Sequence, residues 1–186
     1  MIRNQRQQKP QIKEEFAIVL DIVVNSGKYS DSTSIQAIGT TTFTLLELVP
    51  KNGAEIRIGD KVYIGDGKRE EIQFIKKSLK IDELSGSSKA ELEFILQDII
   101  NQREEDFIKF FNQTGPITIR KHSLELIPGI GKKHLNDLLE ERFKPFESFE
   151  DLKTRCHFFT DPQKALAQRI IKEIEDPEEF KLFTRK

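Results

Sequence analysis

Apolar residues follow two different rhythms along this chain, and the change falls near residue 85. Before that point, short apolar and β-branched runs occupy residues 16–24, 34–38, 41–49, 58–65 and 71–81, with turn signals at residues 52–53 and 65–68 between them. Runs of this length and spacing predict strands. The run at 16–24 is nearly continuous, which is typical of a strand that is buried on both faces or strongly bent. Residues 14–84 are therefore expected to form a small, closed or partly open β-barrel of OB-like size.

From residue 85 onward, apolar residues recur at steps of three and four, which is the spacing of amphipathic helices. Residues 85–87 predict a linker, and Ser88 with Glu91 predicts a capping box that begins a helix. The apolar face of this helix carries Leu92, Ile95, Leu96, Ile99 and Ile100. A second helix carries Phe107, Ile108, Phe110 and Phe111 and stops at residues 112–116. Residues 85–114 are thus expected to be connecting helices.

The segment LELIPGIGKKHL at residues 124–135 predicts two short amphipathic helices joined by a tight turn. Pro128 is a poor helix continuer, and Gly129 and Gly131 permit positive φ and close backbone approach. Ile130 is expected to turn inward onto the core. The amides of Gly129, Gly131 and Lys132 would then be left unpaired at a helix N-terminus, which makes an anion site for phosphate.

This pattern of apolar residue, Pro, Gly, apolar residue, Gly and basic residues resembles the helix-hairpin-helix motif of sequence-independent nucleic-acid binding proteins. The candidate binding residues are Pro128, Gly129, Ile130, Gly131, Lys132 and Lys133. The alternative is a plain αα-hairpin that uses Pro-Gly for its turn. The resemblance also implies a monovalent cation on the carbonyls of Ile127 and Ile130.

The chain after Arg142 repeats this helical unit in degenerate form. Ser148 predicts the cap of one helix, residues 157–160 a turn, and Asp161-Pro162 the start of a final helix. The second turn, taken as residues 158–161, has no glycine and includes the acidic Asp161, so a scaffolding role is expected for it. Residues 115–176 are interpreted as an all-α tandem helix-hairpin-helix domain, with residues 177–186 as a tail. The predicted fold class is α+β.

Composition limits the kind of binding that is possible. The net charge is −1, so nucleic-acid affinity must come from local patches and not from bulk charge. Residues 1–13 are basic and polar and predict a disordered arm, which is either a solvated tail or a contact to phosphates. Cys156 is the single cysteine, which excludes a disulfide framework and favours a reducing, cytoplasmic location. Neither a signal peptide nor a membrane partner is expected.

Two further groups are candidates for nucleic-acid contacts. Arg120, Lys121 and His122 form a basic cluster before the hairpin, with Arg142 and Lys144 beyond it; an ordinary solvated face is the alternative. In the barrel, Tyr63 is a candidate for base stacking. Phe43 and Phe74 are further candidates, for which core packing is the favoured interpretation. The basic residues near these aromatics in sequence are Lys61, Lys68, Arg69, Lys76 and Lys77.

Catalytic chemistry is not expected. The chain has three histidines, no His-x-His or Cys-x-x-Cys spacing and no Walker-type loop. Cys156-His157 is a weak metal pair without a third ligand. We therefore predict a non-enzymatic protein without a metal or cofactor.

Several segments together resemble one archaeal family that is known only as a domain of unknown function and is described as RNA- or nucleotide-binding. They are AIG at 37–39, FTLLEL at 43–48, VYIG at 62–65, FFN at 110–112, PIT at 116–118, RKHSLEL at 120–126, PGIGKK at 128–133 and PFESFEDL at 145–152. The resemblance covers residues 14–175. It implies an OB-like barrel followed by tandem helix-hairpin-helices, an archaeal source, and a link to ribosome or translation functions.

The hypothesis from the sequence is a sequence-tolerant nucleic-acid binder, with RNA favoured through the family context. Two alternatives stay open. One is a protein-interaction scaffold in ribosome or transcription assembly, which would dock through exposed Phe180, Leu182 and Phe183 of the tail. The other is a DNA-binding protein of repair.

Overall fold

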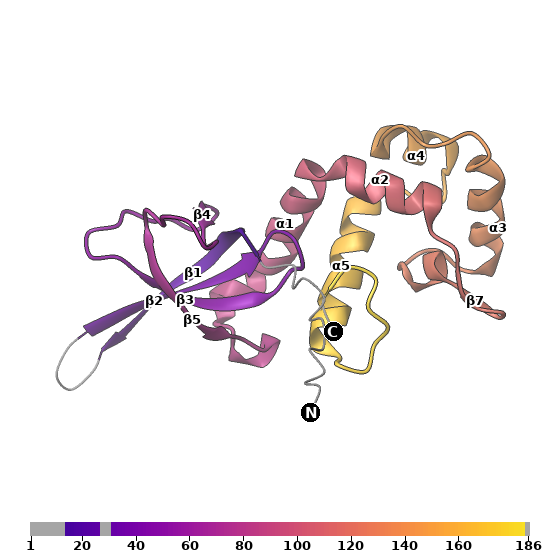
Figure 1. The fold of residues 1–186 in the computed structure, drawn as a ribbon. Coiled ribbons are helices and arrows are strands. Elements are labelled where there is room, and N and C mark those ends of the chain that lie inside the picture. Colours follow the sequence, from indigo (N-terminus) through magenta and orange to yellow (C-terminus); the bar gives the residue numbers. More distant parts are fainter. Residues whose placement is uncertain (1–13, 27–30, 185–186) are drawn as a thin grey trace, which may run out of the picture. The chain divides into compact units, whose positions relative to one another are not determined.

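The chain folds into a strand unit and a helical unit, which divide after Ser78. The computed structural model describes residues 14–26 and 31–184, so the arm expected at residues 1–13 lies outside the described residues. Figure 1 shows the strands of the first unit and the helices of the second in chain order. The α+β class expected from the change in hydrophobic rhythm is confirmed.

The strand unit is one curled antiparallel sheet. Its strands are β1 (Phe16–Ser26), β2 (Asp31–Gly39), β3 (Leu45–Pro50), β4 (Lys61–Tyr63) and β5 (Ile72–Ser78). They lie in the order β4-β1-β2-β3-β5, with every neighbouring pair antiparallel. Because β4 and β5 end this order, the described strands form a half-barrel.

The strand β1 is buried on both faces over residues 17–20, as its continuous apolar run predicts. A register shift between Val19 and Asp21 marks a bulge in its pairing with β2. At this point the Val19 amide donates to the Asp60 carbonyl at 2.9 Å, and the Gly59 amide donates to the Val19 carbonyl at 2.8 Å. A bulge bends a strand and increases its twist, which lets β1 pair with β2 along one edge and meet β4 on the other.

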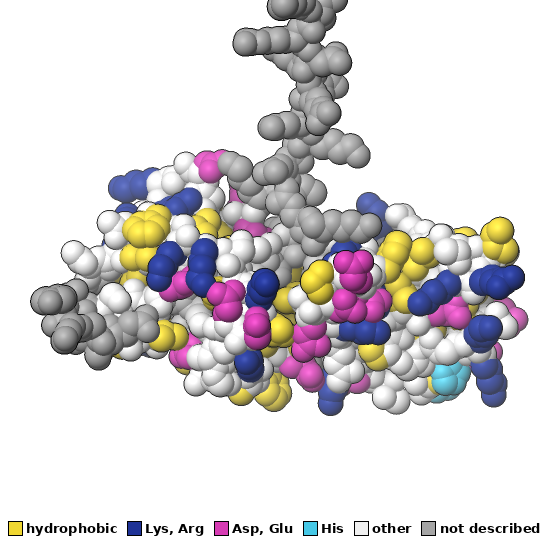
Figure 2. Space-filling model, turned by 90° about the horizontal axis from the view of Figure 1, so that it is seen from below, with side chains coloured by type: hydrophobic (Ala, Val, Ile, Leu, Met, Phe, Trp, Pro, Cys, Tyr) yellow, Lys and Arg dark blue, Asp and Glu magenta, His cyan; other side chains and the backbone are white. Residues whose placement is uncertain are grey.

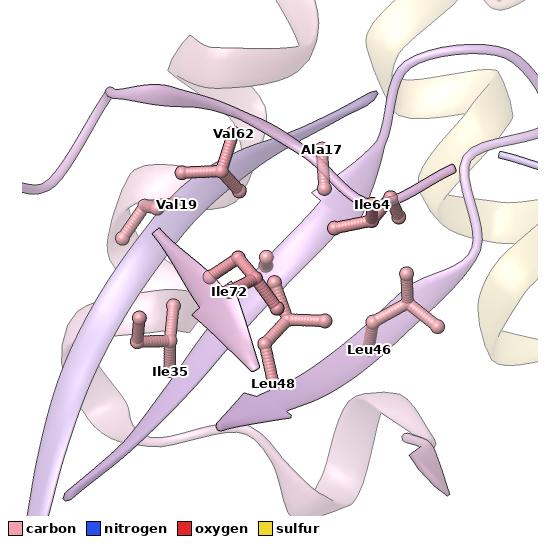
Figure 3. Close-up of a cluster of buried hydrophobic side chains, with 9 residues drawn as sticks. Ala17, Val19, Ile35, Leu46, Leu48, Val62, Ile64 and Ile72 are labelled. Carbon is pink, nitrogen blue, oxygen red and sulfur yellow. The ribbon is translucent and has the colours of Figure 1, made fainter. Parts of the chain in front are cut away.

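The core of the strand unit lies inside the curl of the sheet. It gathers side chains from all five strands and from the residue after β4, and every one is at most 5% exposed. Figure 3 shows them pointing toward one another across the curl. The cluster consists of Ala17, Val19, Ile35, Ala37, Leu46, Leu48, Val62, Ile64 and Ile72.

A single carboxylate organises the β2–β3 connection. The Glu14 side chain accepts hydrogen bonds from the amides of Thr41, Thr42 and Thr44 at 2.8–3.2 Å, and from the Thr42 hydroxyl at 2.6 Å. This carboxyl group occupies the space where a side chain on Gly39 would stand, because a Cβ there would lie 2.1 Å from Glu14 Cδ. Residues 41–44, which the sequence assigns to a strand, are therefore a loop folded around Glu14.

The helical unit contains five α-helices within the described residues. They are α1 (Gly86–Gln102), α2 (Glu104–Gln113), α3 (Lys132–Glu141), α4 (Phe149–Arg155) and α5 (Pro162–Glu175), with a short 3-10 helix η1 (Ile81–Glu83) before them. None of the helices described here has the length and apolarity needed to cross a membrane.

Side-chain caps mark the starts of α1, α4 and α5. Ser148 accepts from the Asp151 amide at 3.1 Å, and Asp161 accepts from the Lys164 amide at 3.0 Å, so both predicted helix starts are confirmed. The predicted start at Ser88 is wrong. Ser85 caps α1 by accepting from the Ser88 amide at 3.0 Å, so the expected linker forms the first turn of the helix.

The chain before the Pro-Gly sequence is not the amphipathic helix that its leucines suggest. It contains a two-stranded hairpin, β6 (Pro116–Thr118) and β7 (Lys121–His122), and one turn of 3-10 helix, η2 (Ser123–Leu126). The His122 amide donates to Glu125 Oε2 at 2.6 Å, and His122 Nδ1 accepts from the Leu124 amide at 3.1 Å. These reciprocal bonds hold η2 to a single turn, and the β-branched residues before it favour extended backbone.

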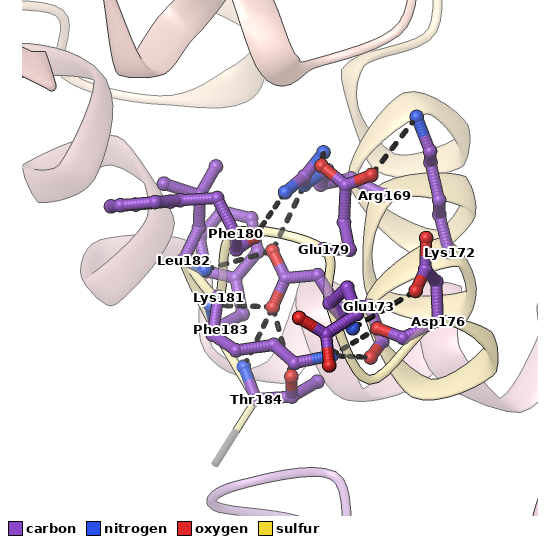
Figure 4. Close-up of polar contacts among 11 residues, drawn as sticks. Arg169, Lys172, Glu173, Asp176, Glu179, Phe180, Lys181, Leu182, Phe183 and Thr184 are labelled. Carbon is purple, nitrogen blue, oxygen red and sulfur yellow. Dashed lines mark hydrogen bonds and ion pairs between the residues drawn. The ribbon is translucent and has the colours of Figure 1, made fainter. Parts of the chain in front are cut away.

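The C-terminal tail is bound to α5 through two buried, oppositely charged side chains. Arg169 Nε donates to Glu173 Oε1 at 2.9 Å, and both side chains are 0% exposed. The other Glu173 contacts are with the tail, whose amides at Leu182, Phe183 and Thr184 donate to the carboxylate at 2.9–3.0 Å. Figure 4 shows this carboxylate enclosed by the returning chain.

The aromatic residues of the tail add a second attachment. The Phe183 ring lies 5.4 Å from the ring of Phe107 and 4.9 Å from that of Phe110. Leu182 and Phe183 are half-buried, whereas Phe180 is 43% exposed. The expectation of three exposed docking residues is wrong for Leu182 and Phe183, because Glu173 draws their backbone onto the helix.

Candidate nucleic-acid interface

The Pro-Gly turn, residues 128–133, connects η2 to α3. Gly129 has φ of +89°, a backbone conformation that side chains with a Cβ rarely adopt. This turn points Ile130 into the core, where it is 3% exposed, and the Ile130 amide donates to the Ile127 carbonyl at 3.1 Å. Gly131 then stands at the N-cap of α3 with extended backbone, and the Leu135 amide donates to its carbonyl at 2.8 Å.

The N-terminus of α3 presents positive charge to solvent. Lys132 and Lys133 begin the helix and are exposed, and no acidic residue lies in its first turn. No side chain caps this helix start, so the first-turn amides face outward together with the positive end of the helix dipole. In Figure 2, Lys and Arg side chains stand out over the end of the helical unit that carries α3. This arrangement favours an anion over any other small ligand.

His134 supports the Pro-Gly turn through two contacts. Its Nδ1 lies 3.0 Å from the Gly129 carbonyl oxygen, and its ring stacks on Phe158 with the centroids 4.2 Å apart and an interplanar angle of 9°. Phe158 belongs to the second predicted turn, at residues 157–160. The half-buried ring of His134 therefore connects the two turns.

The three residues of the basic cluster before the turn, Arg120, Lys121 and His122, have different roles. Arg120 and Lys121 are exposed at the end of the β6–β7 hairpin. His122 is half-buried and caps η2. Burial, together with the charge of Arg142, lowers the pKa of His122, while Glu125 raises it to a smaller degree. His122 therefore supports the hairpin rather than adding charge to it.

Arg142 holds elements together instead of facing solvent. Its Nη1 donates to the Thr114 carbonyl at 2.7 Å and to the Phe111 carbonyl at 3.2 Å, which ties the end of α3 to the end of α2. Burial lowers the pKa of this guanidinium. Lys144, the other member of this candidate pair, is exposed.

Arg155 also ties two helices together, a role that the sequence does not predict. This side chain donates to the backbone carbonyls of Glu141 and Lys144 and pairs with the Asp151 carboxylate at 3.1 Å. Its guanidinium also lies 4.5 Å from the centroid of the Phe146 ring. Arg155 thereby fixes the connection between α3 and α4, for which the sequence carries no local signal.

Tyr63, the candidate in the strand unit, is engaged by its own loop. Its hydroxyl accepts from the Gly67 amide at 3.0 Å, and its ring meets the edge of Phe16 at 5.3 Å. A Cβ on Gly65 would lie 2.5 Å from this hydroxyl, so the loop depends on glycine there. Tyr63 is half-buried and shapes the 63–67 loop, which leaves little of its ring for a base.

The other two aromatic candidates of the strand unit, Phe43 and Phe74, differ in their exposure to solvent. Phe43 is 2% exposed, so core packing is confirmed for it. Phe74 is 46% exposed and Ile75 is 37% exposed, so the expected core packing of Phe74 is wrong. Both belong to β5, which lies at the end of the strand order and leaves most of its side chains outside. Of the three candidates Phe43, Tyr63 and Phe74, Phe74 is thus the most open to a ligand.

Metal or thiol chemistry finds no support in the described part of the chain, which contains no cluster of His, Cys, Asp and Glu suited to a metal ion. Cys156 is 1% exposed. Burial, followed by the charge of Glu141, raises the pKa of the Cys156 thiol to about 11. The thiol is therefore protonated at neutral pH and packs as a small apolar side chain.

Comparison with known proteins gives consistent matches over nearly the whole chain. Residues 13–185 match a family described as "protein of unknown function (DUF655)". The uncharacterized protein MJ0038 of Methanocaldococcus jannaschii is 36% identical over 184 residues, which cover 98% of this chain and 84% of that protein. The crystal structure of Af1531 from Archaeoglobus fulgidus, which carries the same family label, matches with a TM-score of 0.86 and 39% identity over 92% of this chain and 100% of that one.

Proposed function

The chain belongs to the DUF655 family of proteins of unknown function, and from its geometry we propose that it binds nucleic acid, RNA above all, by gripping backbone phosphates at the Pro-Gly turn. The observation that carries this proposal is the start of α3. There, positive φ at Gly129, a helix N-terminus without a side-chain cap and two exposed lysines coincide. Outward amides, the helix dipole and lysine charge together form a phosphate site.

The proposal includes two structural assignments, a tandem helix-hairpin-helix domain and an OB-like module. The α3 and α5 helices each follow a short turn, and His134 with Phe158 joins the two turns. This pairing supports a tandem helix-hairpin-helix domain with one phosphate-binding turn and one bracing turn. The curled half-barrel supports an OB-like module, in which Phe74 of β5 would stack on a base.

The number of cations limits the affinity. Lys132 and Lys133 at the turn, with Arg120 and Lys121 on the β6–β7 hairpin, provide the four exposed positive side chains of the proposed contact. Neutralising Z phosphates of a single strand makes log K fall with log salt at a slope of about −0.7Z. The slope should therefore lie between about −1.4 for the turn alone and about −2.8 for both groups. Such a protein binds weakly at physiological salt and without sequence preference.

The test reverses the charge at the turn without disturbing its backbone. The variant Lys132→Glu/Lys133→Glu should weaken binding of a fluorescently labelled RNA by about tenfold or more at 50 mM salt and flatten the salt slope by about 1.4. The matched control, Lys89→Glu/Lys109→Glu, makes the same charge change at exposed positions on α1 and α2. Equal loss in both variants would show that the site is not at the turn.

Parallel titrations with single- and double-stranded RNA and DNA identify the nucleic acid. The proposal expects RNA to bind more tightly than DNA of the same sequence and length. The link to ribosome or translation functions rests on the family resemblance alone, and crosslinking in cells with sequencing of bound RNA tests it. Crosslinks concentrated on ribosomal RNA would support a role in translation, and the absence of crosslinks to ribosomal RNA would refute it.

A further inference from the structure

The β6–β7 hairpin carries the most exposed apolar side chain of the described residues. Ile119 stands at its tip and is 106% exposed, so no other described side chain covers it. Single apolar residues on surfaces are common and need no explanation by themselves. The surroundings of Ile119 are what distinguish it.

The tip is held on a stiff base. The Thr118 hydroxyl accepts from the Arg120 amide at 3.2 Å, within the turn itself. At the base, the Ser123 hydroxyl donates to the Gly115 carbonyl at 2.6 Å, and Arg142 of α3 donates to the Thr114 carbonyl at 2.7 Å. The hairpin is thus anchored by its own turn and by a neighbouring helix, and it presents Ile119 on a fixed support.

The charge around the tip has one sign. Residues 114–124 contain no acidic residue, while Arg120 and Lys121 follow Ile119 directly and are exposed. Apolar surface flanked only by positive charge complements a ligand that alternates apolar faces with phosphates.

From this juxtaposition we infer that Ile119 is a wedge that enters the base stack of a nucleic-acid duplex while Arg120 and Lys121 hold the flanking phosphates. An aliphatic side chain offers no hydrogen bond and no ring, so it separates bases instead of stacking on them. Single-strand binders instead use aromatic side chains, on which successive bases stack. The aliphatic tip therefore points to a base-paired substrate, which the proposed function takes to be RNA, entered from its wide and shallow minor groove.

This inference rests on the proposed function, because the Pro-Gly turn would hold the RNA that the wedge enters. The two make separate contributions, however. The turn supplies affinity through phosphates, and the wedge changes the stacking of one base step. A measurement that reports stacking separately from affinity can therefore test the wedge alone.

The experiment uses the full chain and RNA stem-loops that carry 2-aminopurine at successive stem positions, since this base brightens when it leaves the stack. At saturating protein, the wild type should brighten one step severalfold. Ile119→Ser should abolish that increase and weaken binding by about five- to tenfold, as expected for the loss of one base contact. Ile119→Leu should retain the signal. Phe94→Ser, at a 66% exposed apolar position on α1, should change neither quantity.

The outcomes separate the two proposals. If the wild type does not bind RNA, the proposed function fails. If binding depends on Lys132 and Lys133 but no stem position brightens, or if Ile119→Ser behaves as the wild type, the wedge is wrong and the phosphate site remains. Ile119-dependent binding to vesicles of anionic phospholipid without any 2-aminopurine signal would also overturn the wedge and assign the tip to a lipid surface.

Discussion

Removal of the Glu173 carboxylate should release the C-terminal tail and destabilise the helical unit. Glu173 receives Arg169 on one side and the amides of Leu182, Phe183 and Thr184 on the other. Deleting one partner of a buried ion pair typically costs about 3–5 kcal/mol, because the remaining charge stays buried without compensation. Arg169 would keep the carboxylate of Glu179 at 3.0 Å. We therefore expect Glu173→Ala to lower the free energy of unfolding by about 3 kcal/mol, near the low end of that range.

Two measurements follow this change. Denaturant unfolding gives the free energy of unfolding, and hydrogen exchange gives the protection of the amides at residues 182–184. Glu175→Ala is the matched control, because it removes a carboxylate from the exposed last residue of the same helix. It should change the free energy of unfolding by less than about 0.5 kcal/mol. A Glu173→Ala variant that unfolds like this control and keeps its tail amides protected would refute the reasoning.

A double-mutant cycle tests the source of the loss. If an orphaned charge dominates, Arg169→Met combined with Glu173→Ala should destabilise less than the sum of the two single variants. If the tail contacts dominate, the two effects should add, because Arg169→Met leaves the Glu173 bonds to the tail amides in place.

Three further perturbations test the turn and the buried thiol by unfolding measurements. Gly129→Ala should cost about 1–2 kcal/mol because of the positive φ, whereas Gly131→Ala, at negative φ, should cost clearly less; equal losses would contradict this account. A double-mutant cycle between His134 and Phe158 should show a coupling of about 0.5–1.5 kcal/mol for the stacked pair, and zero coupling would mean that the turns are not braced. Because the pKa of Cys156 is raised from 9.0 to about 11, the thiol contributes stability below pH 9 that is lost as the pH approaches 11. Relative to Cys156→Ala, the free energy of unfolding of the wild type should fall by up to about 2 kcal/mol over that range. Parallel pH profiles of the two proteins would exclude this effect.

The parts of the fold that the sequence predicts are those with a local cause. Ser148 and Asp161 cap helices through their own side chains, so their positions alone predict where α4 and α5 begin. The burial of β1 follows from a continuous run of β-branched residues, and the inward position of Ile130 follows from the glycines on either side of it. Each of these needs only neighbouring residues.

The parts that the sequence does not predict depend on distant partners. Arg169 and Glu173 are four residues apart on a helix, a spacing that normally indicates a solvated ion pair, but here both side chains are buried and bonded to the returning tail. The β6–β7 hairpin lacks Gly or Asn at its tip, so the turn signal that identifies most hairpins is missing. Phe74 looks like a core residue in the sequence, but β5 lies at the end of the strand order.

The candidate site was predicted to a similar extent. The six residues of the Pro-Gly turn are consecutive, so the sequence itself brings them together. The roles of His122, His134 and Arg142 could not be foreseen, because each is set by a contact with another element. At this turn the sequence predicts which residues form the turn more readily than which residues support it.

The contact between Glu14 and Gly39 has a consequence for the evolution of the family. A side chain at position 39 would collide with the carboxylate that ties down residues 41–44, so neither position can change alone without loosening that loop. Substitutions at these two positions should therefore be inherited together. A relative with a larger residue in place of Gly39 should have lost the acid at position 14 and should hold the loop by other means.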